Sequence, residues 1–284
     1  MPVYERGYTH WKPSGRRSLP AWAVVAKRGI VGPLHKRWLL LLMLAAWVPA
    51  IAKGAMIYFR LKAGDLADLL GGGWVSIDPD GFLRFIEMQR FFTFVLLAIV
   101  GAGLIATDRR DNGLSLYFSR PLGLKSYVGG KVTIVLFYFC LVTLAPALVL
   151  CLFAYLIAPE AGGLELLLLT PLRCIVFCGL SGLGVGLVIL AFSSLGKRSL
   201  PVMIWWAVLV MGTETISGLA APLGATSLQA VNFLGQFHNA GTLLFGVGPR
   251  LDVSAWLSLL VAAGWVALAI VILRRQIRPV EVVS

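Results

Sequence analysis

The sequence has little charge: only 13% of its 284 residues are Asp, Glu, Lys or Arg, whereas 58% are hydrophobic. A soluble domain carries about 25% charged residues, so this composition excludes an ordinary soluble protein. A bilayer core about 30 Å thick is crossed by roughly 20 apolar residues in a helix, which satisfies its own backbone polar groups. The sequence therefore predicts an all-α integral membrane protein with six transmembrane helices, at residues 38–58, 91–107, 132–157, 166–192, 200–220 and 254–273.

Acidic residues are scarce, with 13 Asp and Glu against 25 Lys and Arg. If both termini lie in the cytoplasm, the segments on that side hold 18 of the 25 basic residues but only 4 of the 13 acidic residues. Because cytoplasmic loops carry an excess of Lys and Arg, this distribution predicts that both termini are cytoplasmic. The membrane topology and contact with lipid head groups then explain the formal charge of +12, and no nucleic-acid partner is expected.

Cysteine is rare, and all four cysteines fall inside the third and fourth predicted spans. No disulfide framework is expected there. Cys174 and Cys178 are one helical turn apart and could hold a soft metal ion, but no histidine or carboxylate lies near them in the sequence. Small apolar packing residues are the favoured interpretation, and no metal site is predicted.

Histidine is also rare, which bears on a motif around Ser181. The sequence Gly-Leu-Ser-Gly at 179–182 resembles the nucleophile motif of rhomboid intramembrane proteases. A serine nucleophile needs a base within hydrogen-bond reach, and His10, His35 and His238 all lie outside the predicted spans. The glycines are therefore expected to serve close helix packing.

The chain has no nucleotide-binding loop. A P-loop needs Ser or Thr directly after Gly-Lys, but the Gly-Lys pairs that end at Lys131 and Lys197 are followed by Val132 and Arg198. Any ATP that drives this protein must therefore bind to another polypeptide.

Few ionisable residues lie within the predicted spans. Lys53, Arg173 and Glu214 all fall toward the outer ends of their helices. Charge in a membrane is costly and often functional, so Glu214 and Arg173 are candidates for an outer gate. The competing interpretation is that these side chains simply reach the outer interface.

The segments outside the spans divide the chain into two parts. Residues 1–37 are predicted to form a cytoplasmic tail and an amphipathic interfacial helix, in which Trp22 lies on the apolar face and Lys27 and Arg28 supply charge. Residues 38–284 form the six-span domain. On the outer side, the Asp-Pro-Asp-Gly run at 78–81 predicts a turn within a structured loop. Residues 221–253 predict short re-entrant helices before the last span.

The polar stretch at 107–131 separates the second and third spans on the predicted cytoplasmic side. Asp111 or Asn112 can cap a short helix, in which Leu114, Tyr117 and Phe118 share one face. An apolar and aromatic ridge on a cytoplasmic loop is typical of a docking surface for a protein partner. The alternative is a helix that rests on the lipid surface.

This loop also carries a family resemblance. The run Asp-Arg-Arg-Asp-Asn-Gly-Leu at 108–114, the Ser-Arg-Pro at 119–121, and Tyr127 followed by Gly130 and Lys131 resemble the loop after the second span in permease subunits of ABC-2 type ABC transporters. The six spans, the interfacial helix and the outer re-entrant segment agree with that resemblance, which covers most of residues 19–275.

The resemblance implies a permease that pairs with a second copy or a close relative, and with separate P-loop ATPase subunits that bind ATP and Mg. It implies that transport is directed outward and that this chain holds no cofactor and no catalytic residue. The expected location is a bacterial or archaeal cytoplasmic (inner) membrane. An extracytoplasmic accessory protein is a further candidate partner. The interfacial helix would make a second ATPase contact. An ion-coupled secondary carrier and a non-transport membrane assembly protein stay as alternatives. The resemblance assigns ATPase coupling to Asp108, Arg109, Arg110, Asp111, Gly113, Leu114, Tyr117, Phe118 and Arg120.

Overall fold

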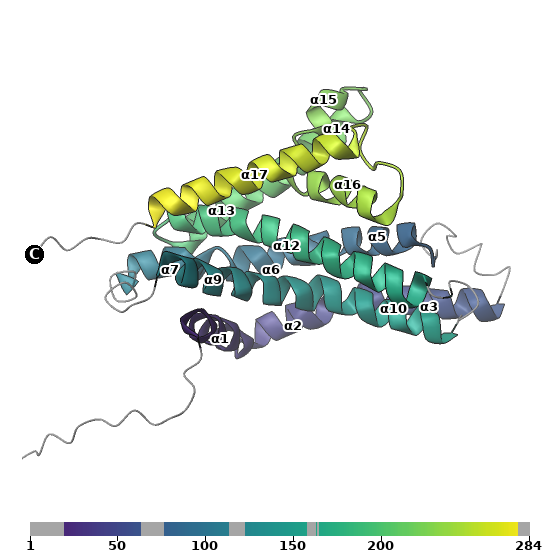
Figure 1. Cartoon of the computed structure of the whole chain (residues 1–284), viewed down its shortest axis with the longest axis horizontal. Helices are drawn as coiled ribbons and strands as arrows, with labels where there is room; N and C mark the ends of the chain where they lie inside the picture. The colour runs from purple at the N-terminus through teal and green to yellow at the C-terminus, as the bar shows by residue number, and fades with distance from the viewer. Residues whose placement is uncertain (1–19, 64–76, 114–122, 158–162, 164, 278–284) are drawn as a thin grey trace, which may run out of the picture.

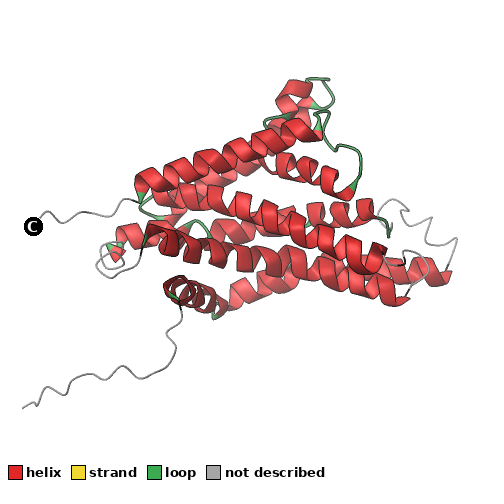
Figure 2. Cartoon of the chain, in the orientation of Figure 1, coloured by secondary structure: helices red, strands yellow, loops and turns green. Residues whose placement is uncertain are grey.

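The computed structural model describes residues 20–63, 77–113, 123–157, 163 and 165–277. Within these ranges every regular element is a helix and no strand occurs (Figure 2). Among the described residues, six helices are long and apolar enough to cross a membrane, so the chain has the architecture of a multi-pass membrane protein, as predicted. These spans are Arg37–Phe59, Arg90–Arg110, Leu124–Ile157, Glu165–Leu195, Ser199–Ala220 and Ala255–Gln276.

Most spans are built from more than one helical segment. Two wide π-helical turns lie just before prolines, because Pro146 and Pro171 lack the N–H that a regular α-helix would bond to the preceding turn. In chain order the segments are α2 (Arg37–Ala45), α3 (Val48–Ala63), α6 (Arg90–Val100), α7 (Gly103–Arg110), α9 (Leu124–Phe139), η2 (Cys140–Leu144), α10 (Ala145–Ile157), η3 (Glu165–Leu169), α12 (Thr170–Leu195), α13 (Ser199–Ala207), η4 (Val208–Gly212), α14 (Thr213–Ala220) and α17 (Ala255–Gln276).

The third span begins at Leu124, whereas the sequence predicted residue 132. The polar run that ends at Lys131 suggested loop, but Lys131 is buried and its charge is paired with Asp108. A paired charge can remain inside a helix bundle, so α9 continues through this position.

The fourth span lies at the centre of the bundle, with α9 on one side and α17 on the other (Figure 1). Its glycines allow this close packing. A Cβ atom at Gly182 or Gly186 would lie 2.8 Å from a side-chain atom of α9, and one at Gly184 would collide with Phe237 of α16. The expected packing role is confirmed for Gly182 but not for Gly179, where a Cβ atom would meet nothing within 4 Å.

Four described helices lie outside the spans: α1 (Ala21–Leu34), α5 (Pro79–Met88), α15 (Thr226–Gln229) and α16 (Phe233–Phe245). Figure 1 shows α1 lying across the direction of the spans, beside α9 and α2. The turn predicted at 78–81 is wrong, because Asp78 accepts a hydrogen bond from Gly81 N at 2.9 Å and caps α5. Asp followed by Pro at the first helical position is a helix start.

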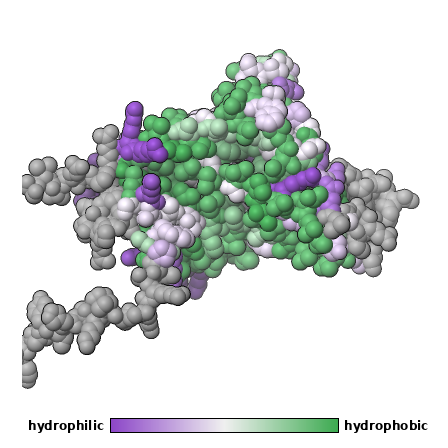
Figure 3. Space-filling view, viewed as in Figure 1, coloured by the Kyte–Doolittle hydropathy of each residue, from purple (hydrophilic) through white to green (hydrophobic). Residues whose placement is uncertain are grey.

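The surface has the distribution of polarity that a membrane requires. Figure 3 shows an apolar face along the middle of the molecule, with hydrophilic residues gathered toward the two ends of the long axis. We call the end where α7 stops and α9 starts the loop end, and the end that carries α5 and α14 the opposite end (Figure 1). Both ends carry polar clusters.

Candidate functional site

The loop end is closed by a cluster of three side chains, Asp108, Tyr127 and Lys131, which we call the neck cluster. Asp108 Oδ2 accepts a hydrogen bond from Tyr127 Oη at 2.6 Å and lies 2.7 Å from Lys131 Nζ. Lys131 also donates to the carbonyl of Leu104 at 2.7 Å. The motif residues on both sides of the 107–131 loop therefore meet, and they fasten the end of α7 to the start of α9.

Arg109 ties α7 to two other spans. Its guanidinium donates to the carbonyl of Ser194 on α12 and to Gln276 Oε1 on α17, the latter at 3.4 Å. Arg110 and Asp111 instead pair with each other at 2.8 Å on the surface, where the Arg110 hydrogen bond holds the pKa of Asp111 below its ordinary value. Two of the predicted coupling residues, Asp108 and Arg109, are thus structural anchors, and the next two are exposed.

The predicted docking ridge lies outside the described residues. Asn112 adopts a left-handed backbone conformation (φ 52°), so the chain turns sharply as it leaves α7. Gly113 follows, partly exposed. The coupling residues that fall outside the described part of the chain are Leu114, Tyr117, Phe118 and Arg120.

The second span is interrupted between α6 and α7, a break that no sequence pattern predicted. Ser193 Oγ on α12 accepts hydrogen bonds from the backbone N–H groups of Ile105 at 2.9 Å and Ala106 at 3.0 Å, and it donates to the carbonyl of Ala102 at 2.8 Å. This one hydroxyl thereby satisfies backbone groups that lack their regular helical hydrogen bonds at the break. The segment that leads to the loop is anchored to the central span.

The predicted interfacial helix is docked on α9. A Cβ atom at Gly130 would lie 2.9 Å from the carbonyl oxygen of Trp22, so the two backbones approach closely. Tyr138 Oη also donates to the carbonyl of Ile30 at 2.7 Å. The side chains of Trp22, Lys27 and Arg28 are exposed. Gly130 directly precedes Lys131, so α1 and the neck cluster meet the same turn of α9.

The opposite end holds a chain of ion pairs that joins three separate parts of the sequence. Arg90, the first residue of the second span, lies 3.3 Å from Glu214 of the fifth span and 3.6 Å from Glu87 of α5. Arg250, which precedes the sixth span, lies 2.7 Å from Asp80 of α5. Neither Arg90 nor Arg250 was predicted as a site residue, because Glu214 and Asp80, which they pair with across the fold, are distant in the chain.

The two residues predicted as an outer gate have separate partners. Glu214 pairs with Arg90, whereas Arg173 pairs with Glu165 at 2.9 Å. Lys53, which the sequence placed near the outer surface, is instead buried and donates to the carbonyl of Gly81. It cannot reach the surface because α5 covers it, with its ammonium 5.3 Å from the ring centre of Phe82.

Two cavities meet at the Arg90–Glu214 pair. One, of about 340 Å³, runs between the second and fifth spans and is largely apolar; the other, of about 310 Å³, is polar and reaches the segment before the sixth span. Glu87, Arg90 and Glu214 line both. Volumes of this size are typical of small-molecule sites.

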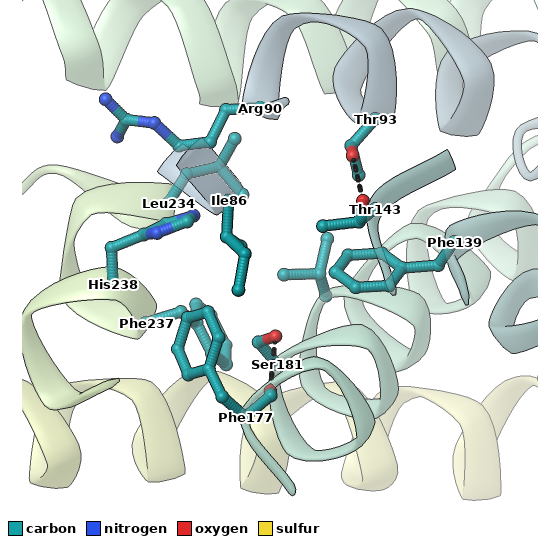
Figure 4. A pocket seen from close by; sticks show the side chains of 11 residues that line it. Ile86, Arg90, Thr93, Phe139, Thr143, Phe177, Ser181, Leu234, Phe237 and His238 are labelled. Atoms are coloured by element: carbon teal, nitrogen blue, oxygen red, sulfur yellow. Dashed lines mark hydrogen bonds between the residues drawn. The ribbon is translucent and has the colours of Figure 1, made fainter. Parts of the chain in front are cut away.

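A third, enclosed cavity of about 20 Å³ lies inside the bundle (Figure 4). His238 and Ser181 both line it. His238 lies in α16, outside the spans as predicted, yet its side chain still comes close to Ser181 of the fourth span. The cause is that α16 is buried against α12. Burial, together with the positive charges of Arg90 and Arg250, holds the pKa of His238 well below its ordinary value.

The pair lacks the geometry of a nucleophile and its base. Ser181 Oγ donates to the carbonyl of Phe177 at 2.7 Å, and the His238 ring packs edge-on against the Phe177 ring with centroids 5.4 Å apart. His238 Nδ1 has no hydrogen-bond partner among the described residues. A serine nucleophile needs a hydrogen bond to its base, so packing describes these residues better than protease chemistry.

The cysteines lie in apolar surroundings. Cys174 and Cys178 are buried, and so is Cys151 of the third span. Over the part of the chain that the structure describes, no group of three His, Cys, Asp or Glu residues could hold a metal ion.

Neither a protein-family model nor a curated protein matches this sequence. The functional argument therefore depends on the chain's own residues and their geometry.

Proposed function

We propose that this chain is the membrane-spanning permease subunit of an ATP-driven transporter of the ABC-2 type. The neck cluster is the observation that carries the proposal. Asp108, Tyr127 and Lys131 belong to the run that resembles the ABC-2 permease loop, and they close its base with a hydrogen bond of 2.6 Å and an ion pair of 2.7 Å. A loop fastened at its base moves as a unit with the two spans that it connects.

This geometry supports a transmission role for the 107–131 loop. A push on the loop reaches α7 and α9 through the neck cluster, α12 and α17 through Arg109, and the break in the second span through Ser193. In this proposal the push comes from ATPase subunits that bind ATP and Mg and dock on Leu114, Tyr117 and Phe118. The exposed Trp22, Lys27 and Arg28 of α1 form a second contact.

The opposite end then faces the outside, and the Arg90–Glu214 pair acts as the outer gate. It links the second span, which carries the loop, to the fifth span. A rigid displacement of the second span separates these charges or brings them together. Both termini are cytoplasmic, the permease works as a dimer, and the direction is export in this proposal.

The two alternatives make different demands. An ion-coupled carrier works without ATP, and its coupling residue has to change protonation or bind an ion during transport. A membrane assembly protein needs no ATPase at all. The docked α1 beside the loop favours a cytoplasmic partner, which the carrier does not need.

Affinity purification of the tagged chain from its native membranes tests the proposal. We expect a P-loop ATPase to co-purify and to hydrolyse ATP in the complex. Purification without any ATPase, combined with transport that survives ATP depletion, would favour the carrier instead.

A further inference from the structure

The larger cavity is open toward the side of the bundle. Its lining is mainly apolar. Three of the lining side chains are exposed: Met88 of α5, Phe91 of the second span and Met211 of the fifth span. Phe94 and Val210 line its interior. An apolar cavity on the flank of a membrane helix bundle matches the chemistry of an acyl chain.

One end of this cavity is charged. Arg90 is the first residue of its span, and Glu214 lies in the last helical segment of its own span, so the pair sits at the depth of lipid head groups. Their nitrogen and oxygen atoms are 3.3 Å apart, longer than the 2.7–2.9 Å of a tight charge-assisted bond. A ligand's charges can therefore compete for both groups.

Beyond the pair, the polar cavity contains charges of both signs. It is lined by three carboxylates, from Glu87, Glu214 and Asp252, and by two guanidinium groups, from Arg90 and Arg250. Arg250 Nε is buried and makes no hydrogen bond within the described residues, although it lies 3.9 Å from Oε2 of Glu87. A phosphate can bind the guanidinium groups, and an ammonium group can bind the carboxylates. Because the cavity has one carboxylate more than it has guanidinium groups, a ligand that carries a phosphate but no ammonium group would be repelled.

We infer that the two joined cavities bind a zwitterionic phospholipid, with an acyl chain in the apolar cavity and an ammonium-phosphate head group at Arg90, Glu214 and Arg250. The ligand comes from the lipid leaflet at the opposite end of the molecule. This site does not depend on the proposed function, because lipid can bind to the chain without any ATPase. Failure of either proposal leaves the other intact.

Native mass spectrometry of the full-length protein in detergent tests this site. The probes are phosphatidylethanolamine, phosphatidylglycerol and diacylglycerol with identical acyl chains. We expect phosphatidylethanolamine to bind about tenfold more tightly than either of the others, a difference of about 1.4 kcal/mol. Equal binding of all three lipids, or a preference for phosphatidylglycerol, would overturn the inference.

Two variants locate the binding. Replacing both charges (Arg90→Gln with Glu214→Gln) should abolish the preference for phosphatidylethanolamine. The matched control is Arg173→Gln with Glu165→Gln, a pair of similar exposure that lines neither cavity; it should bind as the wild type does. Unchanged preference in the first double variant would contradict the assignment.

A substitution on the apolar wall keeps the test decisive if the charge variant does not fold. Met211 is 56% exposed, so Met211→Trp should fold and fill the cavity, with about tenfold weaker lipid binding. Leu260→Trp, on the exposed face of α17, is the control and should change nothing. Equal binding by Met211→Trp and wild type would exclude this cavity as the acyl-chain site.

Discussion

Lys131 places its Nζ atom 2.7 Å from Oδ2 of Asp108, and both side chains are largely buried, with 8% and 19% of their surfaces exposed. Removing one partner of a buried pair leaves an uncompensated charge. Asp108→Asn should therefore lower the free energy of unfolding by about 3 kcal/mol. Thermal unfolding of the purified protein in detergent, followed by tryptophan fluorescence, measures the change.

Asp111→Asn is the control for this variant. It removes the same charge three residues further on, where both side chains of the Arg110–Asp111 pair are 56% exposed. Solvent screens such pairs, so its melting temperature should equal that of the wild type. Equal melting temperatures for Asp108→Asn and Asp111→Asn would show that the neck cluster does not hold the loop.

The break in the second span gives a second prediction. Ser193→Ala removes the hydroxyl that bonds to Ile105 N, Ala106 N and Ala102 O, and a buried polar group without a partner costs about 1–3 kcal/mol. Destabilisation should be accompanied by faster hydrogen exchange at the amides of Ile105 and Ala106. The hydroxyl of the neighbouring Ser194 donates within its own helix, to Ala191 O at 2.7 Å, and Arg109 bonds to the backbone carbonyl of Ser194, which Ser194→Ala keeps. If Ser194→Ala has the same effect on α7, the anchoring role of Ser193 is wrong.

A third prediction concerns the docking of α1 on α9. Gly130→Ala places a methyl group 2.9 Å from both the carbonyl oxygen of Trp22 and Cβ of Val25, whereas Gly129→Ala meets no atom within 4 Å. Overpacking of this kind costs about 1–3 kcal/mol. Hydrogen exchange across α1 should accelerate in Gly130→Ala and stay unchanged in Gly129→Ala. Identical exchange in the two variants would mean that α1 is not held at this position.

The span positions could be predicted from sequence because hydropathy integrates over about 20 residues. The exact ends of the helices were harder to predict where single polar residues lie near them. A charged residue such as Lys131 indicates a loop unless its partner, here Asp108, is known. The Asp-Pro pair at Asp78 is compatible both with a turn and with a helix start, and the structure shows the helix start. The local sequence determines that a helix forms. Where the helix begins depends on a tertiary partner in α9, and on whether the Asp-Pro pair starts a turn or a helix in α5.

The contacts between elements could not be predicted in the same way. Arg90 and Glu214 are 124 positions apart, and nothing in either neighbourhood specifies the other. The burial of His238 depends on how α16 packs against α12, which hydropathy does not report. The three residues of the neck cluster could be predicted to act together, because they belong to one sequence motif. Their direct contact could not be predicted, because it depends on how α7 and α9 pack.

In the proposed transporter the 107–131 loop receives force from an ATPase, and loss of ATPase docking tests this role most directly. Tyr117→Ala with Phe118→Ala removes the predicted ridge without changing charge. We expect this double variant to insert in the membrane but to lose the co-purifying ATPase and its stimulated ATP hydrolysis. Leu259→Ala with Leu260→Ala, two exposed leucines of α17, should retain both. Stoichiometric co-purification of the ATPase with the ridge variant would contradict the account.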